Sequence, residues 1–326
     1  MTSPQGMRAT ASGRVARVTR ALLSMLLAAM ASRAFALSGG LPVSEAIAAR
    51  GADAPLARQV ASHVVWFLSD AARGAISACS GTLVHPQVVL TAAHCVASLG
   101  EPMPRTVVVF GMDITQSLLD SRSTTREVVM SMTHPQFKRV WSRRRSPVDI
   151  DAAKRSYSFS ADDDIAGVDV ALLLLHRPAP DTHRAAPVGA LGRSDRQGEL
   201  AIAGFGQRER NTQADAPRLR FATAPARRAM EGNRAMEDRD DVTLTSIDLA
   251  SAFRAGKRVS ACSGDSGGAL FYRDNGGLRL VGVIAAGDTA CREVSRFASV
   301  EANRAALRRM FDELTDGMAA QRENPF

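Results

Sequence analysis

The chain has 326 residues, of which 45% are hydrophobic, so wholesale disorder is excluded and one large or two smaller β domains can be built. The formal net charge is +8, and all but three of the 41 basic residues are arginines. These arginines alternate with acidic residues and accompany no nucleic-acid-binding motif, so nucleic acid is excluded as an expected partner. An attraction to acidic substrates remains compatible with the charge.

Residues 1–36 have the pattern of an export signal. Arginines at positions 8, 14, 17 and 20 precede an apolar run over 21–31, and Ala34-Phe35-Ala36 has the small-x-small pattern of a signal-peptidase site. The run is short for a bilayer span. We therefore expect cleavage after Ala36 and an exported protein, periplasmic or extracellular, without a membrane span after cleavage. A retained anchor is the alternative.

Residues 37–54 are rich in glycine, alanine and proline and predict a pro-segment or a loosely held N-terminal arm. From Val60 onward, short apolar runs are separated by polar or glycine-containing turns, which indicates an all-β sandwich or a pair of barrels. Residues 142–164 are strongly charged and predict a solvated insertion loop, with a processing site or an exosite as the alternative. The charged residues 226–241 are interpreted in the same way.

The C-terminal region changes to helical spacing. Apolar residues recur there with charges between them, at Val300, Leu307, Met310, Phe311 and Leu314. Residues 315–326 are expected to form a frayed tail.

The four cysteines predict two disulfides in an exported chain, for which three pairings exist. Nearness in sequence favours Cys79–Cys95 and Cys262–Cys291. No Cys-x-x-Cys or His-x-x-x-His spacing occurs, so we expect neither a metal site nor a cofactor.

Two short motifs carry the chemistry: Gly-Asp-Ser-Gly-Gly at 264–268 and Thr-Ala-Ala-His-Cys at 91–95. A serine hydroxyl needs a base to take its proton, and the base needs a third group to fix its tautomer. Ser266, His94 and Asp169 can fill these roles. We prefer Asp169 to Asp164 because the unbroken apolar run 170–175 follows it, whereas Gly167 interrupts the run after Asp164.

At these motifs the chain resembles the chymotrypsin/trypsin-like (S1) serine peptidases of the bacterial, exported type, with the histidine, aspartate and serine in the same order. The Ala-Gly-Phe-Gly segment at 203–206 and the His-Pro element at 134–135 resemble further family segments. The resemblance implies two six-stranded antiparallel β-barrels with a C-terminal helix. The N-terminal barrel would cover 55–190 with the insertion about 142–164, and the second barrel with its closing helix 191–314. It implies the same disulfide pairing.

The resemblance also assigns roles around the serine. The N–H groups of Gly264 and Ser266 would form the oxyanion hole. Ser260 would lie at the base of the substrate pocket and Gly287 in its wall, which implies a neutral residue before the cut. Asp288 and Glu293 are close enough in sequence to keep basic specificity open. Ala285 and Ala286 stand where relatives have Ser-Trp.

The resemblance also implies how the protein is activated. In relatives a new N-terminal ammonium pairs with the aspartate before the serine, here Asp265. Three cations remain open for that role: a terminus near Ala48, the Leu37 terminus folded back, or an internal arginine.

The leading hypothesis is an exported serine endopeptidase that acts on proteins or peptides, with a protein inhibitor as a candidate partner and activation from a zymogen. The alternative is a catalytically inactive binding or regulatory protein on the same fold. A Gly-x-Ser-x-Gly esterase is excluded, because its histidine would follow the serine and the last histidine here is His183.

Overall fold

The computed structural model describes residues 37, 40–70, 76–97, 106–137, 163–192, 195, 197–206, 217–227, 246–250, 252–254, 257–275, 277–287, 291, 294–316 and 323–326. The predicted signal peptide 1–36, nearly all of the insertion 142–164 and most of the charged stretch 226–241 lie outside these ranges. Within them, no helix has both the length and the hydrophobicity needed to cross a membrane.

Six strands from the first half of the chain close into an antiparallel barrel in the order β2-β3-β4-β7-β6-β5. Their bounds are β2 Val64–Asp70, β3 Ile76–His85, β4 Val88–Thr91, β5 Thr106–Val109, β6 Thr125–Thr133 and β7 Ala171–Leu175. Every residue of β4 and β7 is buried, which explains their uninterrupted apolar sequences. Thr91 pairs with Ala171, so the segments holding His94 and Asp169 leave the barrel at the same end.

The second half of the chain forms an antiparallel sheet in the order β1-β9-β8-β13-β14-β15-β10. Six of its strands are β8 Glu199–Gly204, β9 Arg220–Pro225, β10 Ser246–Ala250, β13 Ala269–Asp274, β14 Gly277–Gly287 and β15 Val294–Ser299. The two-residue strand β1 (Leu41–Pro42) is added at one edge, and β11 (Ala252–Arg254) and β12 (Lys257–Val259) form a separate ribbon.

The prediction of an all-β fold of two six-stranded antiparallel β-barrels with a C-terminal helix is confirmed in its class, its two antiparallel halves and its helix, with closure into a barrel found for the first half. The first sheet is a closed barrel, and the second has β1 and β10 at its edges within the described residues. One large apolar cluster joins the barrel, the helices and part of the second sheet, and a smaller cluster lies within the second sheet.

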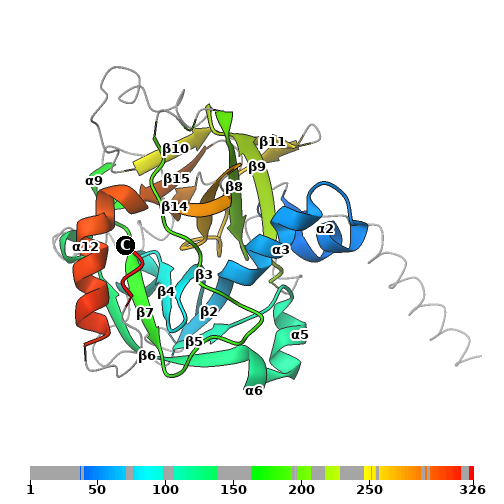
Figure 1. The fold of residues 1–326 in the computed structure, drawn as a ribbon. Coiled ribbons are helices and arrows are strands. Elements are labelled where there is room, and N and C mark those ends of the chain that lie inside the picture. The colour runs from blue at the N-terminus through cyan, green and yellow to red at the C-terminus, as the bar shows by residue number, and fades with distance from the viewer. Residues whose placement is uncertain are drawn as a thin grey trace, which may run out of the picture. The chain divides into compact units, whose positions relative to one another are not determined.

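Residues 41–54 form a strand and helices against the rest of the protein (Figure 1), where the sequence predicts a pro-segment or a loosely held arm over 37–54. Strand β1 pairs with β9, helix α2 (Val43–Ala49) follows at once, and α3 (Ala54–His63) leads into β2. Val43 and Ala46 of α2 are buried in the same apolar cluster as Leu56 and Val60 of α3. A helix this short has too few turns for its period to stand out in the sequence.

Helix α12 (Val300–Leu314) begins at the Ser299 N-cap, whose hydroxyl accepts the N–H of Ala302. It packs on β6 and β7 of the barrel and on β14 and β15 of the second sheet (Figure 1). The last residue, Phe326, is buried and its ring lies edge-on to Phe311 of α12 at a centroid distance of 6.4 Å. The chain end expected as a frayed tail is therefore docked on the helix over residues 323–326.

The other helices within the described ranges are short and lie between residues 94 and 167. They are α4 His94–Ala97, α5 Ile114–Leu119, α6 Ser121–Thr124 and α9 Asp163–Gly167. Of these, α4 carries His94 and α9 precedes Asp169 by two residues, so both contribute to the candidate site described next.

Candidate active site

His94 and Asp169 are in direct contact. The Nδ1 atom of His94 lies 2.6 Å from Oδ2 of Asp169, and the backbone N–H of His94 donates to Oδ1 at 2.8 Å. The two bonds fix the rotation of the imidazole and require a proton on Nδ1, which leaves Nε2, 3.7 Å from the disulfide sulfur of Cys95, as the basic nitrogen. Burial acts to lower the pKa of His94, but the charge and hydrogen bond of Asp169 outweigh it, and the pKa is raised. The pair therefore has the geometry of an oriented general base.

The segment before Asp169 is held by helix α12. The side-chain amide of Asn303, which is buried, donates to the carbonyl of Gly167 at 2.7 Å and to that of Ser299 at 2.7 Å. Sequence reasoning did not find Asn303, because an asparagine within a helix carries no pattern that links it to a loop so far away in the chain. Its contact makes it a positioning residue for the loop that carries the carboxylate.

The serine motif is a glycine-rich turn pressed against the barrel. Gly264 and Gly267 have φ of 92° and 80°, a region that favours glycine. A Cβ on Gly267 would lie 2.0 Å from Oγ1 of Thr91, 2.2 Å from the carbonyl oxygen of Ser80 and 3.0 Å from N of Ala92. Thr91 and Ala92 lie three and two residues before His94. The turn that carries Ser266 therefore touches the segment that carries the histidine.

Ser80, on β3 of the barrel, is hydrogen-bonded to the serine turn and to the residue after β8 in the second sheet. Its hydroxyl donates to the carbonyl of Gly264 at 2.8 Å and accepts the N–H of Phe205 at 2.9 Å, and its own N–H donates to the carbonyl of Ser266 at 2.8 Å. All three bonds cross between the two sheets. Sequence analysis did not identify Ser80, because a serine that follows a cysteine forms no pattern that indicates this role.

The N–H groups of Gly264 and Ser266 donate to no group in the described part of the chain. Both residues are partly exposed, whereas Asp265 between them is buried. Two unoccupied donors beside a half-buried hydroxyl are the groups that an oxyanion hole requires.

The carboxyl group of Asp265 is fully buried and accepts two backbone N–H bonds, from Gly206 at 2.7 Å and from Cys262 at 2.9 Å. Burial raises the pKa of Asp265 to about 7, against the lowering effect of these bonds and of the Arg220 charge. Arg220 pairs across β8 and β9 with Gly204, and a Cβ on Gly204 would lie 2.4 Å from Oδ1 of Asp265. Because directly opposed residues point to the same face, Arg220 extends on the side of this carboxyl group.

The structure contains two disulfides, Cys79–Cys95 and Cys262–Cys291. The first joins β3 to the residue after His94, and the second closes the segment before Ser266. Cys79, Cys95 and His94 lie close together, but disulfide sulfurs are not the thiolates that bind zinc. This cluster therefore braces the histidine segment.

The two expected pocket residues lie on neighbouring segments. Ser260 is fully buried, with its hydroxyl 3.3 Å from that of Ser295. A Cβ on Gly287 would lie 2.6 Å from the carbonyl oxygen of Ala261, so glycine permits the close approach of these two segments. Asp288 and Glu293 lie outside the described residues. Ala285, next to Ala286 before the glycine, is buried.

A family model described as Trypsin matches residues 58–304 of the chain. Among curated proteins, it is similar to a Limulus clotting factor C from Carcinoscorpius rotundicauda, at 26% identity over 230 residues that make up 68% of this chain and 19% of the relative. Clotting factor C from Tachypleus tridentatus is 25% identical over 234 residues, again 68% of this chain and 19% of the relative. Granzyme M from Homo sapiens is 35% identical over 83 residues, 26% of this chain and 30% of the relative. The matches thus span about a fifth of the clotting factors' own length and under a third of granzyme M.

Proposed function

We propose that this chain, which belongs to the trypsin family of serine peptidases, is an active endopeptidase that uses Ser266 as nucleophile, His94 as base and Asp169 as the group that orients the base. The observation that carries the proposal is the His94–Asp169 contact at 2.6 Å together with the Gly267 turn held against Thr91. The Gly-Asp-Ser-Gly-Gly motif alone could also occur in an inactive relative. Catalysis needs in addition the oriented imidazole and the two available N–H groups.

In this mechanism Nε2 of His94 takes the hydroxyl proton as Oγ of Ser266 attacks the substrate carbonyl. The developing oxyanion is bound by the N–H groups of Gly264 and Ser266, and each such donor typically lowers the barrier by about 3 kcal/mol. The imidazolium then gives its proton to the leaving amine, which leaves an acyl group on Ser266. Water, deprotonated by the same imidazole, releases the acid and restores the serine.

We further propose a neutral residue before the scissile bond. The support is the chemistry of Ser260, whose buried hydroxyl carries no charge to pair with a lysine or arginine side chain. A peptide set that varies only this position tests the proposal. Cleavage after aromatic or aliphatic residues is expected, and a preference for arginine would contradict it.

Export and activation are proposed to share one cleavage, after Ala36. The side chain of Leu37 is fully buried in the apolar cluster of the second sheet, together with Leu270 and Ile284. A few residues later, β1 aligns Pro42 with Arg220, the residue directed towards Asp265. We propose that an ammonium group at Leu37, folded back towards this segment, adds a second positive charge to that of Arg220 at the Asp265 carboxyl group. A terminus at Ala48 is disfavoured because Ala48 is exposed in the last turn of α2.

Fluorophosphonate labelling of the exported protein tests the catalytic proposal, with Ser266→Ala as control and N-terminal sequencing of the labelled band. Labelling that disappears in Ser266→Ala, from a band that begins at Leu37, is the expected result. A folded chain that begins at Leu37 and takes no label would instead favour the inactive binding or regulatory protein.

A matched pair of chains tests the activation proposal separately. One begins at Leu37, and the other retains Ala36 as a single additional residue. If the Leu37 ammonium supplies charge to Asp265, the longer chain should label at least about tenfold more slowly, since one lost buried contact costs about 1.4 kcal/mol or more. Equal labelling of the two chains would mean that Arg220 alone supplies the positive charge to Asp265. Arg220→Gln should then abolish the labelling.

A further inference from the structure

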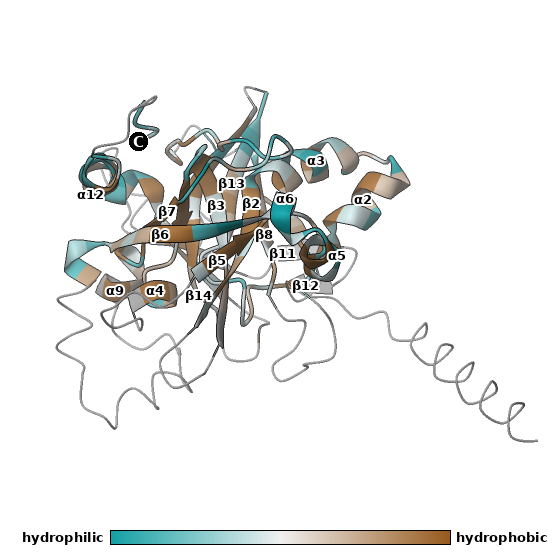
Figure 2. Cartoon of the chain, turned by 90° about the horizontal axis from the view of Figure 1, so that it is seen from below, coloured by the Kyte–Doolittle hydropathy of each residue, from teal (hydrophilic) through white to brown (hydrophobic). Residues whose placement is uncertain are grey.

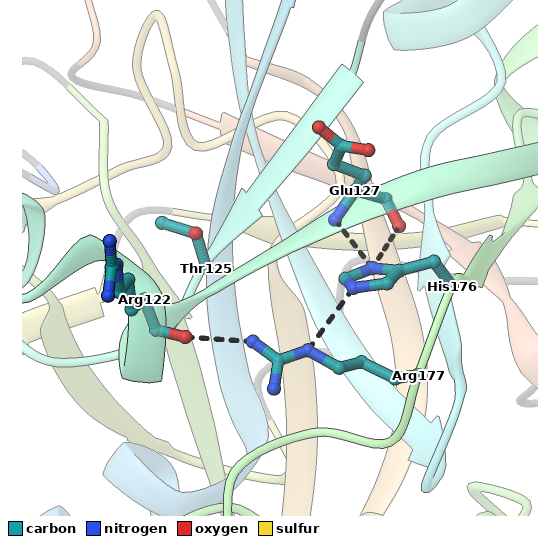
Figure 3. A pocket seen from close by; sticks show the side chains of 5 residues that line it. All are labelled: Arg122, Thr125, Glu127, His176 and Arg177. Atoms are coloured by element: carbon teal, nitrogen blue, oxygen red, sulfur yellow. Dashed lines mark hydrogen bonds between the residues drawn. The ribbon is translucent and has the colours of Figure 1, made fainter.

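A surface pocket of about 410 Å³ lies on the barrel between the N-terminal end of β6 and the residues that follow β7 (Figure 3). It is lined by Arg122, Thr125, Glu127, His176 and Arg177. His176 and Arg177 follow β7 directly, and Asp169 precedes it by two residues. The five residues of β7 separate the two ends by about 17 Å. The pocket is therefore remote from the reacting atoms and belongs to another site.

Internal hydrogen bonds hold one arginine in the pocket and leave another free. Arg177 donates from Nε to Nε2 of His176 at 3.1 Å and from Nη2 to the carbonyl of Arg122 at 2.8 Å. The imidazole is held in turn by the backbone of Glu127, with Nδ1 3.0 Å from the N atom and 3.3 Å from the O atom. The guanidinium of Arg122 makes no bond to any described residue. One cation is thus preoriented and the other is available to a ligand.

A third arginine lies beneath the pocket and adds to its charge. Arg126 is buried and donates to three backbone carbonyls, those of Pro178, Ser123 and Thr125. Burial and the nearby charge of Arg177 lower the pKa of Arg126. None of the ion pairs within the described residues involves Arg122, Arg126 or Arg177. Their positive charge is therefore offered to an external anion.

The surroundings of the pocket include both an acidic side chain and exposed apolar side chains. Figure 3 shows the carboxylate of Glu127 pointing away from His176 and Arg177. Farther along the same strand, Val129 and Met130 are exposed, with 55% and 48% of their surface accessible. Figure 2 shows β6 changing from hydrophilic beside α6 to hydrophobic towards its middle. A uniformly charged polyanion would meet a carboxylate and apolar side chains here, whereas a peptide with both acidic and apolar residues would match them.

We propose that this pocket is a docking site for an acidic segment of protein substrates that also carries apolar side chains. Its carboxylates pair with Arg122 and Arg177, and its apolar residues pack on Val129 and Met130. Because the pocket is remote from Ser266, the site raises affinity for extended substrates without touching the scissile bond. The role in substrate capture rests on the proposed peptidase function; the binding itself does not.

Direct binding to the folded, exported Ser266→Ala chain tests the proposal without any need for activity. The probe is the fluorescein-labelled peptide Glu-Glu-Leu-Glu-Leu-Glu, followed by fluorescence anisotropy, with Gln-Gln-Leu-Gln-Leu-Gln as the neutral comparison. Arg122→Glu should raise the dissociation constant of the acidic peptide about five- to tenfold, the effect of turning one exposed attraction into a repulsion. Arg309→Glu on α12 changes the net charge equally at an exposed site and should leave the binding unchanged.

Three results would overturn the proposal: equal binding of the two peptides, equal weakening by both substitutions, or binding of a heparin oligosaccharide at Arg122 without binding of the acidic peptide. In the active chain, Arg122→Glu should raise KM for a protein substrate that carries the acidic segment, with kcat and the hydrolysis of short peptides unchanged. Failure of fluorophosphonate labelling with intact peptide binding would refute the peptidase function and leave the docking site standing.

Discussion

Replacement of Gly267 by alanine should separate the serine turn from the histidine segment. The new Cβ would lie 2.0 Å from Oγ1 of Thr91 and 2.2 Å from the carbonyl oxygen of Ser80, and the second of these is backbone that no rotamer change can move. The φ of 80° adds strain for any L-residue. Strain of about 1–3 kcal/mol and forced overpacking of a similar size together predict a loss of about 2–6 kcal/mol in the free energy of unfolding.

Gly277→Ala is the matched control, because Gly277 also has a positive φ, 117°, but a Cβ there would meet nothing within 4 Å. It should show the backbone strain alone, about 1–3 kcal/mol. Urea unfolding measures both losses, and fluorophosphonate labelling measures the activity. Gly267→Ala should also lower the labelling rate, because Thr91 and Ala92 lie within three residues of His94, whereas Gly277→Ala should not. Equal stability and equal labelling of the two variants would refute the close contact between the turn and the barrel.

Three further predictions follow from the buried polar groups. The labelling rate should rise with pH through a midpoint above 6.5, because the pKa of His94 is raised and only its neutral form accepts a proton, and Asp169→Asn should lower that midpoint. Asn303→Asp should destabilise the protein by about 3 kcal/mol in urea unfolding, more than Asn303→Ala, because a carboxylate would face the carbonyls of Gly167 and Ser299. In the chain that retains residues 1–36, the pKa of Asp265 rises from 3.8 to about 7 on folding. The stability this contributes is complete below pH 3.8 and is lost as pH rises to about 7, a fall of about 4 kcal/mol that Asp265→Asn should remove.

The parts of the site that the sequence predicted are those in which local chemistry leaves few alternatives. A histidine beside a cysteine and an aspartate before a wholly apolar run led to His94 and Asp169, which the structure brings to 2.6 Å from each other. The apolar spacing after Ser299 likewise predicted the helix that is found at Val300–Leu314. In each case the signal lies within a few residues of the feature it predicts, so no knowledge of distant contacts was needed.

The parts that were missed depend on contacts between residues far apart in the chain. Ser80 bonds to Gly264 across 184 positions, and Asn303 bonds to Gly167 across 136. Neither residue type has a local pattern that predicts such a partner. The docked chain end was missed for the same reason, because Phe326 is held by Phe311 and by Arg308, whose guanidinium donates to its carbonyl oxygen.

These long-range bonds also determine which substitutions would disturb the geometry of the catalytic residues. His94 and Asp169 belong to the barrel, whereas Ser266 belongs to the second sheet, so the relative position of base and nucleophile depends on the contacts between the two halves. Around the serine turn these contacts are the hydrogen bonds of Ser80 with Gly264 and Ser266 and the packing of Gly267 against Thr91. These bonds belong to neither sheet's own ladder of backbone hydrogen bonds, and the apolar cluster that the two sheets share does not include them. Catalytic activity should therefore respond more strongly than the stability of either sheet to changes at this interface. Ser80 lies outside the catalytic motifs, so its loss should lower activity most relative to the free energy of unfolding.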